Sequence, residues 1–307
     1  MNILFITPFF YPHIGGVEKH VLKVSKELIK KGNKVTVLTR KHEKRIINKQ
    51  TINGVRIERF YYPQIKFIGL SLVWLQLIKR FRLIFNADVV HIHDVFIWYL
   101  PFRFIFFNKK NVTTIHGFEW DNPLSLIGLW QKRLAIKLSN ASVGAGEFLE
   151  KYLKVKFDLI TYGGISMSES IYSKVYDLVV YVGRLEENTG FLEFLKWLDK
   201  NKKYHVDFCG DGPLRAECEK YGIVHGFTDP VPFLKKAEIC VPGGYLAALE
   251  GLAYNCKLKL FWNNKVKEDY WKMSPFYKLK GKELKKWARE QTWDKIADEY
   301  MDLYTSK

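Results

Sequence analysis

The sequence predicts an α/β protein with two domains, each built on a parallel sheet. Two stretches, one from Asn2 and one from Leu178, open with the same order of elements: a short apolar strand, a glycine-containing loop and a helical pattern. Strands and helices alternate along both halves, as in a parallel sheet with crossover helices. A chain of 307 residues also exceeds what one hydrophobic core usually serves, which favours two domains.

The first half is expected to contribute six strands, at residues 3–6, 34–38, 55–60, 89–92, 112–115 and 141–143. Between the first two strands, Val17, Val21, Val24 and Leu28 recur at helical spacing, and Gly32 follows as a stop signal. The expected helix therefore spans 17–31.

The second half repeats the scheme. Strands are expected at 178–182, 205–209, 223–225, 239–241 and 258–261, and helices at 191–199, 214–221, 232–236, 245–254 and 281–292. A linker is expected within 161–173, because glycines and serines replace the apolar periodicity there.

Net charge is distributed very unequally along the chain. Residues 1–160 hold 26 Lys and Arg against 11 Asp and Glu, whereas the remaining residues hold 23 and 21. Nearly all of the net charge of +17 therefore lies in the first half. Such a half favours a polyanionic neighbour, either an acidic membrane surface or a nucleic acid, and charge does not decide between them.

Aromatic and basic residues are interleaved between residues 60 and 110. The segment 67–78 is too short to span a bilayer, but Lys66, Lys79, Arg80 and Arg82 flank it, which suits a segment lying at the lipid interface. A core helix with solvated basic ends is the alternative. No apolar run reaches the ~18 residues of a spanning helix, and residues 1–10 suit a buried strand better than a signal peptide.

The cysteines indicate neither a zinc site nor a disulfide framework. All four lie in the second half and none forms a CxxC pair: Cys209, Cys218, Cys240 and Cys256. We therefore expect a protein of the reducing cytoplasm, peripheral to a membrane.

Glycine loops follow several predicted strands. Gly15 and Gly16 stand before the first helix, where a missing Cβ would let a phosphate reach backbone N–H groups, although a lone pair of glycines by itself favours an ordinary tight turn. Arg184 follows the strand 178–182, and its planar fork matches phosphate oxygens. Further glycine loops, at 210–213 and 242–244, follow two more strands.

Polar side chains stand near the same strand ends. Glu250 lies about one and a half turns into the helix after the last loop, where it could face a ribose or sugar hydroxyl. His116 follows a strand and precedes Gly117, so it is either a ligand-binding residue or a buried structural one. His91 and His93 share one strand face, with Asp94 beyond them. Acceptor binding or a structural role suits this cluster better than a metal, since further ligands are missing.

The order of these pieces resembles the retaining glycosyltransferase family 4, of the GT-B fold. The matching segments are 15–18 (GGVE), 91–94 (HIHD), 114–117 (TIHG), 182–185 (VGRL), 210–213 (GDGP), 249–253 (LEGLA) and 292–297 (TWDKIA). The resemblance implies two Rossmann-like parallel-sheet domains facing a central cleft. It further implies a domain at 1–165 for the acceptor, a domain at 166–290 for the nucleotide-sugar, and a last helix at 291–307 that returns to the first domain.

The resemblance also implies an activity and a set of roles. A hexosyl-type sugar would pass from a nucleoside-diphosphate sugar to a lipid-linked or glycan acceptor, with retention at the anomeric carbon, without a metal and without a cofactor. Gly16 and Arg184 would hold the diphosphate, His116 the donor sugar and Glu250 the ribose. The other implied donor residues are Gly15, Gly210, Gly212, His225, Phe227, Gly244, Tyr245 and Leu246. His93 and Asp94 are expected to bind the acceptor, and no Asp-x-Asp pair is present to hold a metal.

Two departures from the family pattern bear on activity. Thr189 stands where the family usually has a lysine, and the acidic residue usually found about two turns before Glu250 is absent. One of two phosphate cations is therefore missing, which can weaken transition-state stabilisation by ~2 to 4 kcal/mol. A nearby lysine could replace it.

Other functions stay open on the sequence. One alternative is a GT-B nucleotide-binding protein with impaired transfer, and another is a protein that glycosylates or binds nucleic acid. We expect an anionic membrane rather than nucleic acid as the partner of the basic half. A dinucleotide-dependent oxidoreductase is disfavoured, because neither half has a GxGxxG turn with a downstream acid.

Overall fold

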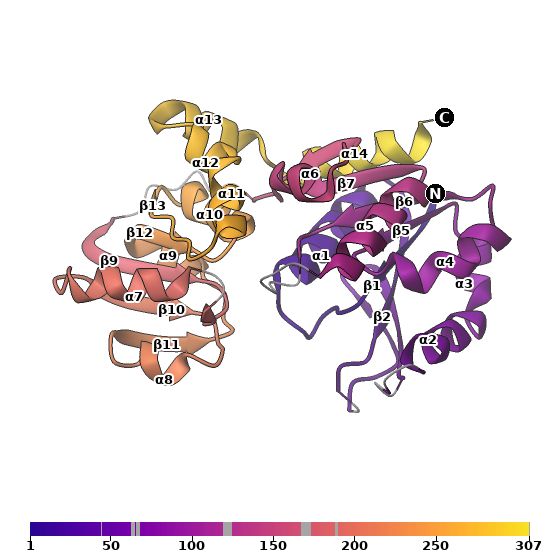
Figure 1. The fold of residues 1–307 in the computed structure, drawn as a ribbon, viewed down its shortest axis with the longest axis horizontal. Helices are drawn as coiled ribbons and strands as arrows, with labels where there is room; N and C mark the ends of the chain where they lie inside the picture. The colour runs from indigo at the N-terminus through magenta and orange to yellow at the C-terminus, as the bar shows by residue number, and fades with distance from the viewer. Residues whose placement is uncertain are drawn as a thin grey trace. The chain divides into compact units, whose positions relative to one another are not determined.

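A computed structural model describes residues 1–43, 45–62, 65, 68–118, 125–166, 173–187 and 190–306. Its contacts divide the chain into two compact units. Unit 1 comprises residues 1–145, 149–161 and 293–307, and unit 2 comprises residues 146–148 and 162–292. Figure 1 shows the last helix, in yellow, together with the indigo and magenta elements of unit 1.

Unit 1 is built on an eight-stranded sheet in the order β3-β4-β2-β1-β5-β6-β7-β8. All neighbours are parallel except β3 and β4. The strands are β1 (Asn2–Thr7), β2 (Lys34–Arg40), β3 (Lys49–Ile52), β4 (Val55–Phe60), β5 (Val89–His93), β6 (Lys110–Ile115), β7 (Ala141–Ala145) and β8 (Leu159–Thr161). The six expected strands are confirmed, while β3 and β8 were not foreseen.

Seven helices of the described residues accompany this sheet. They are α1 (Gly16–Lys30), α2 (Gly69–Ile78), α3 (Phe81–Asn86), α4 (Phe96–Ile105), α5 (Leu126–Leu138), α6 (Phe148–Leu153), which begins at the edge of unit 2, and α14 (Trp293–Thr305). Helix α1 buries Val21, Val24 and Leu28 and ends at Lys30, and Gly32 follows with a φ of +83°, which suits glycine. The expected helix is thus confirmed.

Helix α14 is anchored on unit 1 by buried tyrosines and surface ion pairs. The Tyr300 hydroxyl lies 2.9 Å from Nε2 of His20, and the Tyr304 hydroxyl lies 2.6 Å from Nδ1 of His91. Lys31 on the segment after α1 contacts carboxylates of α14 at 2.8 and 2.7 Å. The C-terminal helix is therefore an integral part of unit 1.

Unit 2 is built on a five-stranded parallel sheet in the order β11-β10-β9-β12-β13. The strands are β9 (Val175–Val182), β10 (His205–Cys209), β11 (Gly222–Gly226), β12 (Ala237–Pro242) and β13 (Lys257–Leu258). The helices are α7 (Phe191–Asp199), α8 (Arg215–Cys218), α9 (Val231–Lys236), α10 (Tyr245–Ala253), α11 (Lys265–Lys272), α12 (Pro275–Lys278) and α13 (Gly281–Glu290). An aromatic core on one face contains Tyr181, Phe191, Phe194 and Phe208, and all four cysteines are buried thiols.

Two expected elements of unit 2 are shorter than the sequence suggests. The strand expected at 258–261 is confined to β13, because β12 ends at Pro242, which has no N–H to extend the ladder. The helix expected at 214–221 is reduced to α8, since the chain turns after Cys218 to enter β11 at Gly222. A Cβ on Gly222 would lie 2.0 Å from a carbonyl oxygen of β10, so β11 can begin here only with a glycine.

Candidate functional site

Three turns of unit 2 meet at the edge where β9, β10 and β12 end. These strands are parallel, so their carboxyl ends lie at one edge of the sheet. An ideal Cβ on Gly210 would lie 1.7 Å from the carbonyl oxygen of Gly183, and a Cβ on Gly183 would lie 2.9 Å from Cα of Gly243. Backbone packs directly on backbone here, so glycine is needed for the turns to approach so closely.

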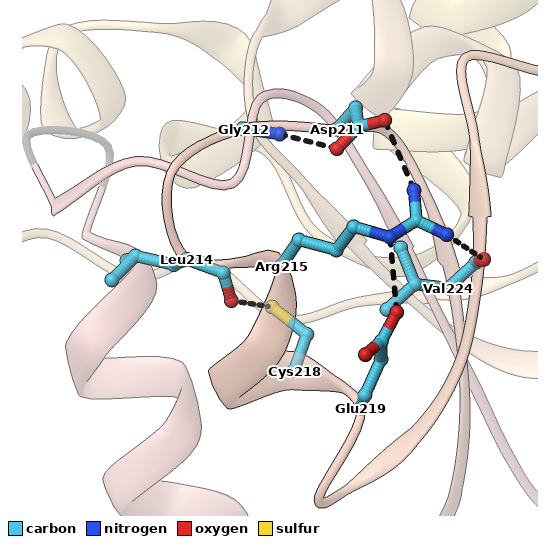
Figure 2. Close-up of polar contacts among 7 residues, drawn as sticks. All are labelled: Asp211, Gly212, Leu214, Arg215, Cys218, Glu219 and Val224. Carbon is cyan, nitrogen blue, oxygen red and sulfur yellow. Dashed lines mark hydrogen bonds and ion pairs between the residues drawn. The ribbon is translucent and has the colours of Figure 1, made fainter.

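The turn after β10 is held by a hydrogen-bond network, which Figure 2 shows. The carboxylate of Asp211 accepts from the Gly212 N–H at 2.9 Å and from Nη1 of Arg215 at 3.0 Å. Arg215 also donates to the Glu219 carboxylate at 2.9 Å and to the Val224 carbonyl at 3.3 Å. This arginine therefore ties the turn both to α8 and to β11.

Arg184 lies at the same sheet edge, directly after Gly183. Its side chain is 53% exposed, and Nη1 lies 3.2 Å from the Glu186 carboxylate. The Tyr181 hydroxyl donates to the Arg184 carbonyl at 2.8 Å and fixes the backbone. Because an exposed ion pair is weak, the guanidinium can exchange this carboxylate for phosphate oxygens.

The N-terminus of α10 opens beside these turns, after Gly244. The Tyr245 N–H donates to the Tyr270 hydroxyl at 2.7 Å, and the two rings stack with centroids 3.7 Å apart. The Tyr245 side chain is thus part of the core, so its predicted contribution to donor binding is limited to the backbone. Leu246 is half-buried and lies against Gly163.

The remaining donor residues predicted in unit 2 lie at two places. Glu250 is half-buried on α10, five residues after the helix begins, about 7 Å along the axis. Nε2 of His225 lies 2.6 Å from the Asp207 carboxylate, and the ring stands 4.2 Å from that of Phe233. Phe227 is 54% exposed at the end of β11. An exposed ring beside a fixed imidazole suits stacking with a nucleobase.

In unit 1, the predicted glycine loop lies at the N-terminus of α1. A Cβ on Gly15 would lie 2.4 Å from Oε2 of Glu18, whose Oε1 is 2.9 Å from Nδ1 of His13. No heavy atom lies within 4 Å of the Cβ position of Gly16. The Gly15 side of the turn is therefore filled by a carboxylate, and Gly16 is the residue that leaves space for a ligand.

Four buried or partly buried histidines lie close together: His20 on α1, His91 and His93 on β5, and His116 directly after β6. The rings of His91 and His93 stack at 4.5 Å on one face of β5, as their spacing predicts. His91 is held by the hydroxyls of Tyr304 and Thr114, at 2.6 and 2.7 Å, which gives it a structural role. His93 Nδ1 lies 2.9 Å from Nε2 of His116, which connects it to the predicted sugar-binding residue.

His116 and Asp94 are joined at the ends of β6 and β5. The Asp94 carboxylate accepts from the His116 N–H at 2.9 Å and lies 3.7 Å from Nζ of Lys132 on α5. Burial, and next the Lys132 charge, lower the pKa of His116 to about 3. Burial raises the pKa of Asp94. His116 is thus neutral at physiological pH and can donate or accept a hydrogen bond but does not act as a cation.

A cavity of about 110 Å³ opens beside this pair. Its lining includes Asp94, Ile97, Ile115, Phe118, Leu129 and Lys132. A cavity of about 150 Å³ holds one benzene-sized molecule, so this space admits only part of an acceptor. Its polar lining consists of the Asp94 carboxylate, the Lys132 ammonium, Ser125 and Gln131, and the other lining residues are apolar or glycine, a combination suited to a single sugar or hydroxyl group at the end of an apolar chain.

Exposed apolar side chains cluster on two parts of unit 1. The first part, α2 to α4 and the turn that follows, exposes Leu75, Ile78, Phe81, Phe85, Phe104, Ile105 and Phe107. The second, the tip of α5, exposes Leu126, Ile127 and Trp130 by 81%, 71% and 59%, next to the cavity residues Gly128 and Leu129. Exposed apolar groups of this number mark a binding surface.

Helix α2 combines the two alternatives that its sequence allowed. Val73 and Leu77 are buried, as in a core helix, whereas Leu75 and Ile78 are exposed. Arg80 was expected at a lipid interface, but its Nε lies 3.2 Å from the Glu58 carboxylate and its side chain is largely buried. That expectation is wrong for Arg80. Lys66 and Phe67 lie outside the described residues, as does Thr189.

The structure thus brings the predicted residues together in two groups. In unit 2, Arg184, Gly210, Gly212 and Gly244 share one sheet edge. In unit 1, Gly16, His93, Asp94 and His116 surround the ends of β1, β5 and β6. Within the described ranges, no three His, Cys, Asp or Glu side chains gather to hold a metal ion. No helix of that part of the chain is long and apolar enough to cross a membrane.

Solved glycosyltransferases share this fold. Over 99% of this chain and 98% of its own, sucrose-phosphate synthase from Thermosynechococcus elongatus superposes with a TM-score of 0.74 at 15% identity. Anabaena Alr3699/HepE in complex with UDP and glucose gives a TM-score of 0.65 at 12% identity, over 99% of this chain and 96% of that one. Identities this low show the fold, which is GT-B with two parallel-sheet domains.

Sequence comparison adds the family. The model of Glycosyltransferase Family 4 matches residues 14–157. One subunit of the human phosphatidylinositol N-acetylglucosaminyltransferase is 36% identical over 62 residues, which are 20% of this chain and only 12% of the human protein. An uncharacterized 42.6 kDa protein in the cps region of Klebsiella pneumoniae is 26% identical over 254 residues, 66% of this chain and 67% of that protein.

The fold is that of the GT-B glycosyltransferases. Residues 14–157, just under half of the chain, are similar to Glycosyltransferase Family 4, in agreement with the order of the motifs.

Some residues of the site were not found from the sequence. Lys132 and the tip of α5 lie in a helix that was not expected, and only the amphipathic spacing of 126–138 could have revealed it. Lys267 on α11 lies beside the Gly243 turn, with Nζ 2.8 Å from the Gly243 carbonyl oxygen. A single lysine within a charged helix gives no sequence signal of burial.

Proposed function

We propose that this protein transfers a hexosyl group from a nucleoside-diphosphate sugar to a lipid-linked acceptor, with retention at the anomeric carbon and without a metal. The observation that carries the proposal is the edge of unit 2. There, closely packed glycine turns, the start of α10 and the half-exposed Arg184 come together. Backbone N–H groups at a helix start and a guanidinium fork are what a diphosphate requires.

In the transfer, the bond between the anomeric carbon and a diphosphate oxygen breaks, and the diphosphate leaves with the electron pair. A hydroxyl oxygen of the acceptor forms the new bond on the same face of the sugar, and the proton of that hydroxyl passes to the departing diphosphate oxygen. Arg184 and the N–H groups of Gly244 and Leu246 at the start of α10 stabilise the negative charge that develops on the diphosphate, which lowers the barrier. The Glu250 carboxylate accepts hydrogen bonds from the ribose hydroxyls, and His225 and Phe227 contact the nucleobase.

His116 serves the donor sugar as a neutral hydrogen-bonding group. Its low pKa keeps it uncharged, and His93 and Asp94 hold its ring and backbone. Asp94 and Lys132 in the adjacent cavity are suited to orient the acceptor hydroxyl. The similar structure of Anabaena Alr3699/HepE is a complex with UDP and glucose, so a uridine diphosphate sugar is the first donor to test.

The acceptor side supports a lipid-linked substrate taken from an anionic membrane by a peripheral, cytoplasmic enzyme. The exposed Leu126, Ile127 and Trp130 flank the cavity, where they can enter the interfacial region of a bilayer. The basic first half supplies attraction to acidic lipids. The related human enzyme is named for a phosphatidylinositol acceptor, which agrees with this class.

The test of transfer is release of nucleoside diphosphate from a panel of uridine, adenosine, guanosine and thymidine diphosphate sugars. Arg184→Ala and Glu250→Ala should each lower turnover at least tenfold. Arg56→Ala serves as the matched control, because Arg56 is also half exposed, at 57%, but lies on β4 away from both residue groups. Absence of both turnover and nucleotide binding with every donor contradicts the proposal.

The same assay decides on the second candidate function, a GT-B protein with impaired transfer. Thr189 in place of the family's lysine motivates it. Nucleotide binding without turnover supports this candidate, and Thr189→Lys should then restore product formation.

Membrane docking is tested by sedimentation with vesicles containing phosphatidylglycerol or only phosphatidylcholine. The wild type should bind the anionic vesicles, and an Ile127→Ser, Trp130→Ser double variant should lose most of this binding while its fold is unchanged. If an RNA or DNA oligonucleotide displaces the protein from the vesicles at equal charge concentration, the nucleic-acid alternative is favoured instead.

A further inference from the structure

Lys267 is a fully buried lysine at the sheet edge that carries the proposed diphosphate site. Its side chain has 0% exposure, and Nζ donates to the Gly243 carbonyl oxygen at 2.8 Å. The ammonium also stands 4.1 Å from the ring centroid of Tyr270 and 5.1 Å from that of Trp271. A buried ammonium loses hydration energy, and the carbonyl oxygen and the two ring faces help to compensate for that loss.

Helix α11 contacts the turn before α10 at two points. Lys267 reaches the Gly243 carbonyl, and the Tyr270 hydroxyl accepts from the Tyr245 N–H at 2.7 Å. Residues 267 and 270 are three apart and so share one face of α11. The backbone on both sides of Gly244 is therefore fixed by this one helix face.

The same turn touches the loop that carries Arg184. Gly243 N–H donates to the Val182 carbonyl at 2.8 Å, and the Cα of Gly243 lies 2.9 Å from the ideal Cβ position of Gly183. The charge of Arg184 lowers the pKa of Lys267, second to burial, so the two cations act on each other across this turn.

We propose that Lys267 is a positioning residue of the diphosphate subsite, whose ammonium fixes the Gly243 turn and supplies a buried positive charge to the bound diphosphate. The inference rests on the proposed function and deepens it. It also explains how the site can work with a threonine at Thr189, because the second cation comes from α11 and not from the loop after β9.

Binding of a diphosphate should be accompanied by the uptake of one proton by Lys267. Burial and Arg184 lower the pKa of Lys267 to about 7, so at pH 8 the unliganded protein holds this lysine mostly neutral. A bound diphosphate favours the ammonium form and raises its pKa, so binding takes up a proton. Affinity for the diphosphate should then fall about tenfold between pH 7 and pH 8.5.

Among the described residues, few other groups near Lys267 can contribute to this uptake. Burial raises the pKa of both Tyr245 and Tyr270, which stay neutral in this range. On its own helix, Asp269 is paired with Lys265 at 3.5 Å. The Tyr181 hydroxyl is occupied by the Arg184 carbonyl.

The test is isothermal titration calorimetry of the full chain with UDP, ADP, GDP and TDP at pH 8, in HEPES and in Tris. These buffers have different ionisation enthalpies, so their comparison counts the protons taken up. The wild type should take up about one proton per bound diphosphate. Lys267→Met should take up none and bind at least tenfold more weakly, while Lys267→Arg should bind well at every pH without uptake.

Lys272→Met is the matched control, because Lys272 lies on the same helix but is half exposed and paired with Glu268. It should keep the proton uptake of the wild type. Nucleotide binding with no uptake, or with uptake that persists in both Lys267 variants, overturns the role of Lys267 and leaves the proposed function standing. Failure of every nucleotide to bind overturns the proposed function, and this inference with it.

Discussion

Acid should destabilise unit 1 through its buried histidines. Burial lowers the pKa of His20, His91 and His93 well below 6.5, and their mutual repulsion adds to the effect. The unfolded chain binds protons at these residues below pH 6.5, whereas the folded chain does not. The unfolding free energy of unit 1 is therefore highest above pH 6.5, the histidine pKa in the unfolded chain, and it decreases as the pH falls below that value.

The loss of unfolding free energy depends only on the histidine pKa in the unfolded chain, because the folded pKa lies below the tested pH range. Between pH 7.0 and pH 5.5, one such histidine costs about 1.3 kcal/mol of unfolding free energy. The three fully buried rings together cost about 4 kcal/mol, a large part of the ~5 to 15 kcal/mol that holds a typical domain.

Hydrogen exchange followed by mass spectrometry, on peptides from β5 and β6, measures this loss in unit 1 separately from unit 2. His20→Gln keeps a polar group near the Tyr300 hydroxyl and should remove about a quarter of the pH dependence, because His116, whose pKa is lowered to about 3, contributes alongside the three fully buried rings. His205→Gln is the matched control, because His205 is 80% exposed in unit 2 and should leave the dependence unchanged. An opening free energy that stays constant from pH 7.0 to pH 5.5, or an identical slope in His20→Gln, refutes the reasoning.

Four further predictions concern packing and the glycine turns. Gly210→Ala should lower the unfolding free energy by about 1 to 3 kcal/mol in urea denaturation, because its Cβ would collide with a backbone carbonyl of the β9 turn. Gly16→Ala should leave that free energy unchanged, since its Cβ meets open space, yet lower turnover of the donor if a diphosphate approaches there. Arg215→Ala should raise the Kd for UDP severalfold in calorimetry, because the turn after β10 loses its tie to β11. Arg59→Leu should lower the unfolding free energy by about 2 to 4 kcal/mol, because the buried guanidinium donates to two backbone carbonyls. Arg56→Leu on the same strand should lower it by less than about 0.5 kcal/mol, because Arg56 is half exposed. Equal Tm values for the two variants would speak against this account.

Strands of the central sheets could be predicted from the sequence because burial on both faces leaves a continuous apolar run. β1 and β5 are buried along nearly their whole length and stand out in the sequence. β3 (Lys49–Ile52) could not be found in this way, since it is a partly exposed, antiparallel edge strand of mixed polarity. Its pairing depends on the turn at Asn53 and Gly54, both with positive φ.

The sequence predicted the candidate site only where a residue type is typical of a local structure, such as glycine in a turn or arginine directly after a strand. Glycine turns and an arginine after a strand can be seen in a sequence, and Arg184, Gly210 and Gly212 do lie at one edge. Lys132 and Lys267 could not be found, because each becomes part of a site through a contact with a segment far away in the chain. Distance in sequence hides such partners until the fold is known.

The glycines show how far a sequence motif can be interpreted. Gly210 was predicted, like Gly16, to bind the donor, yet Gly210 and its neighbours Gly183 and Gly243 are required by contacts between neighbouring turns. At Gly16, in contrast, the space in front of the missing Cβ is open. The packed glycines therefore shape the edge that presents Arg184 and the start of α10, while the open one is the glycine at which we predict that a ligand approaches the backbone. Loss of function with intact stability on substitution separates the second kind of glycine from the first.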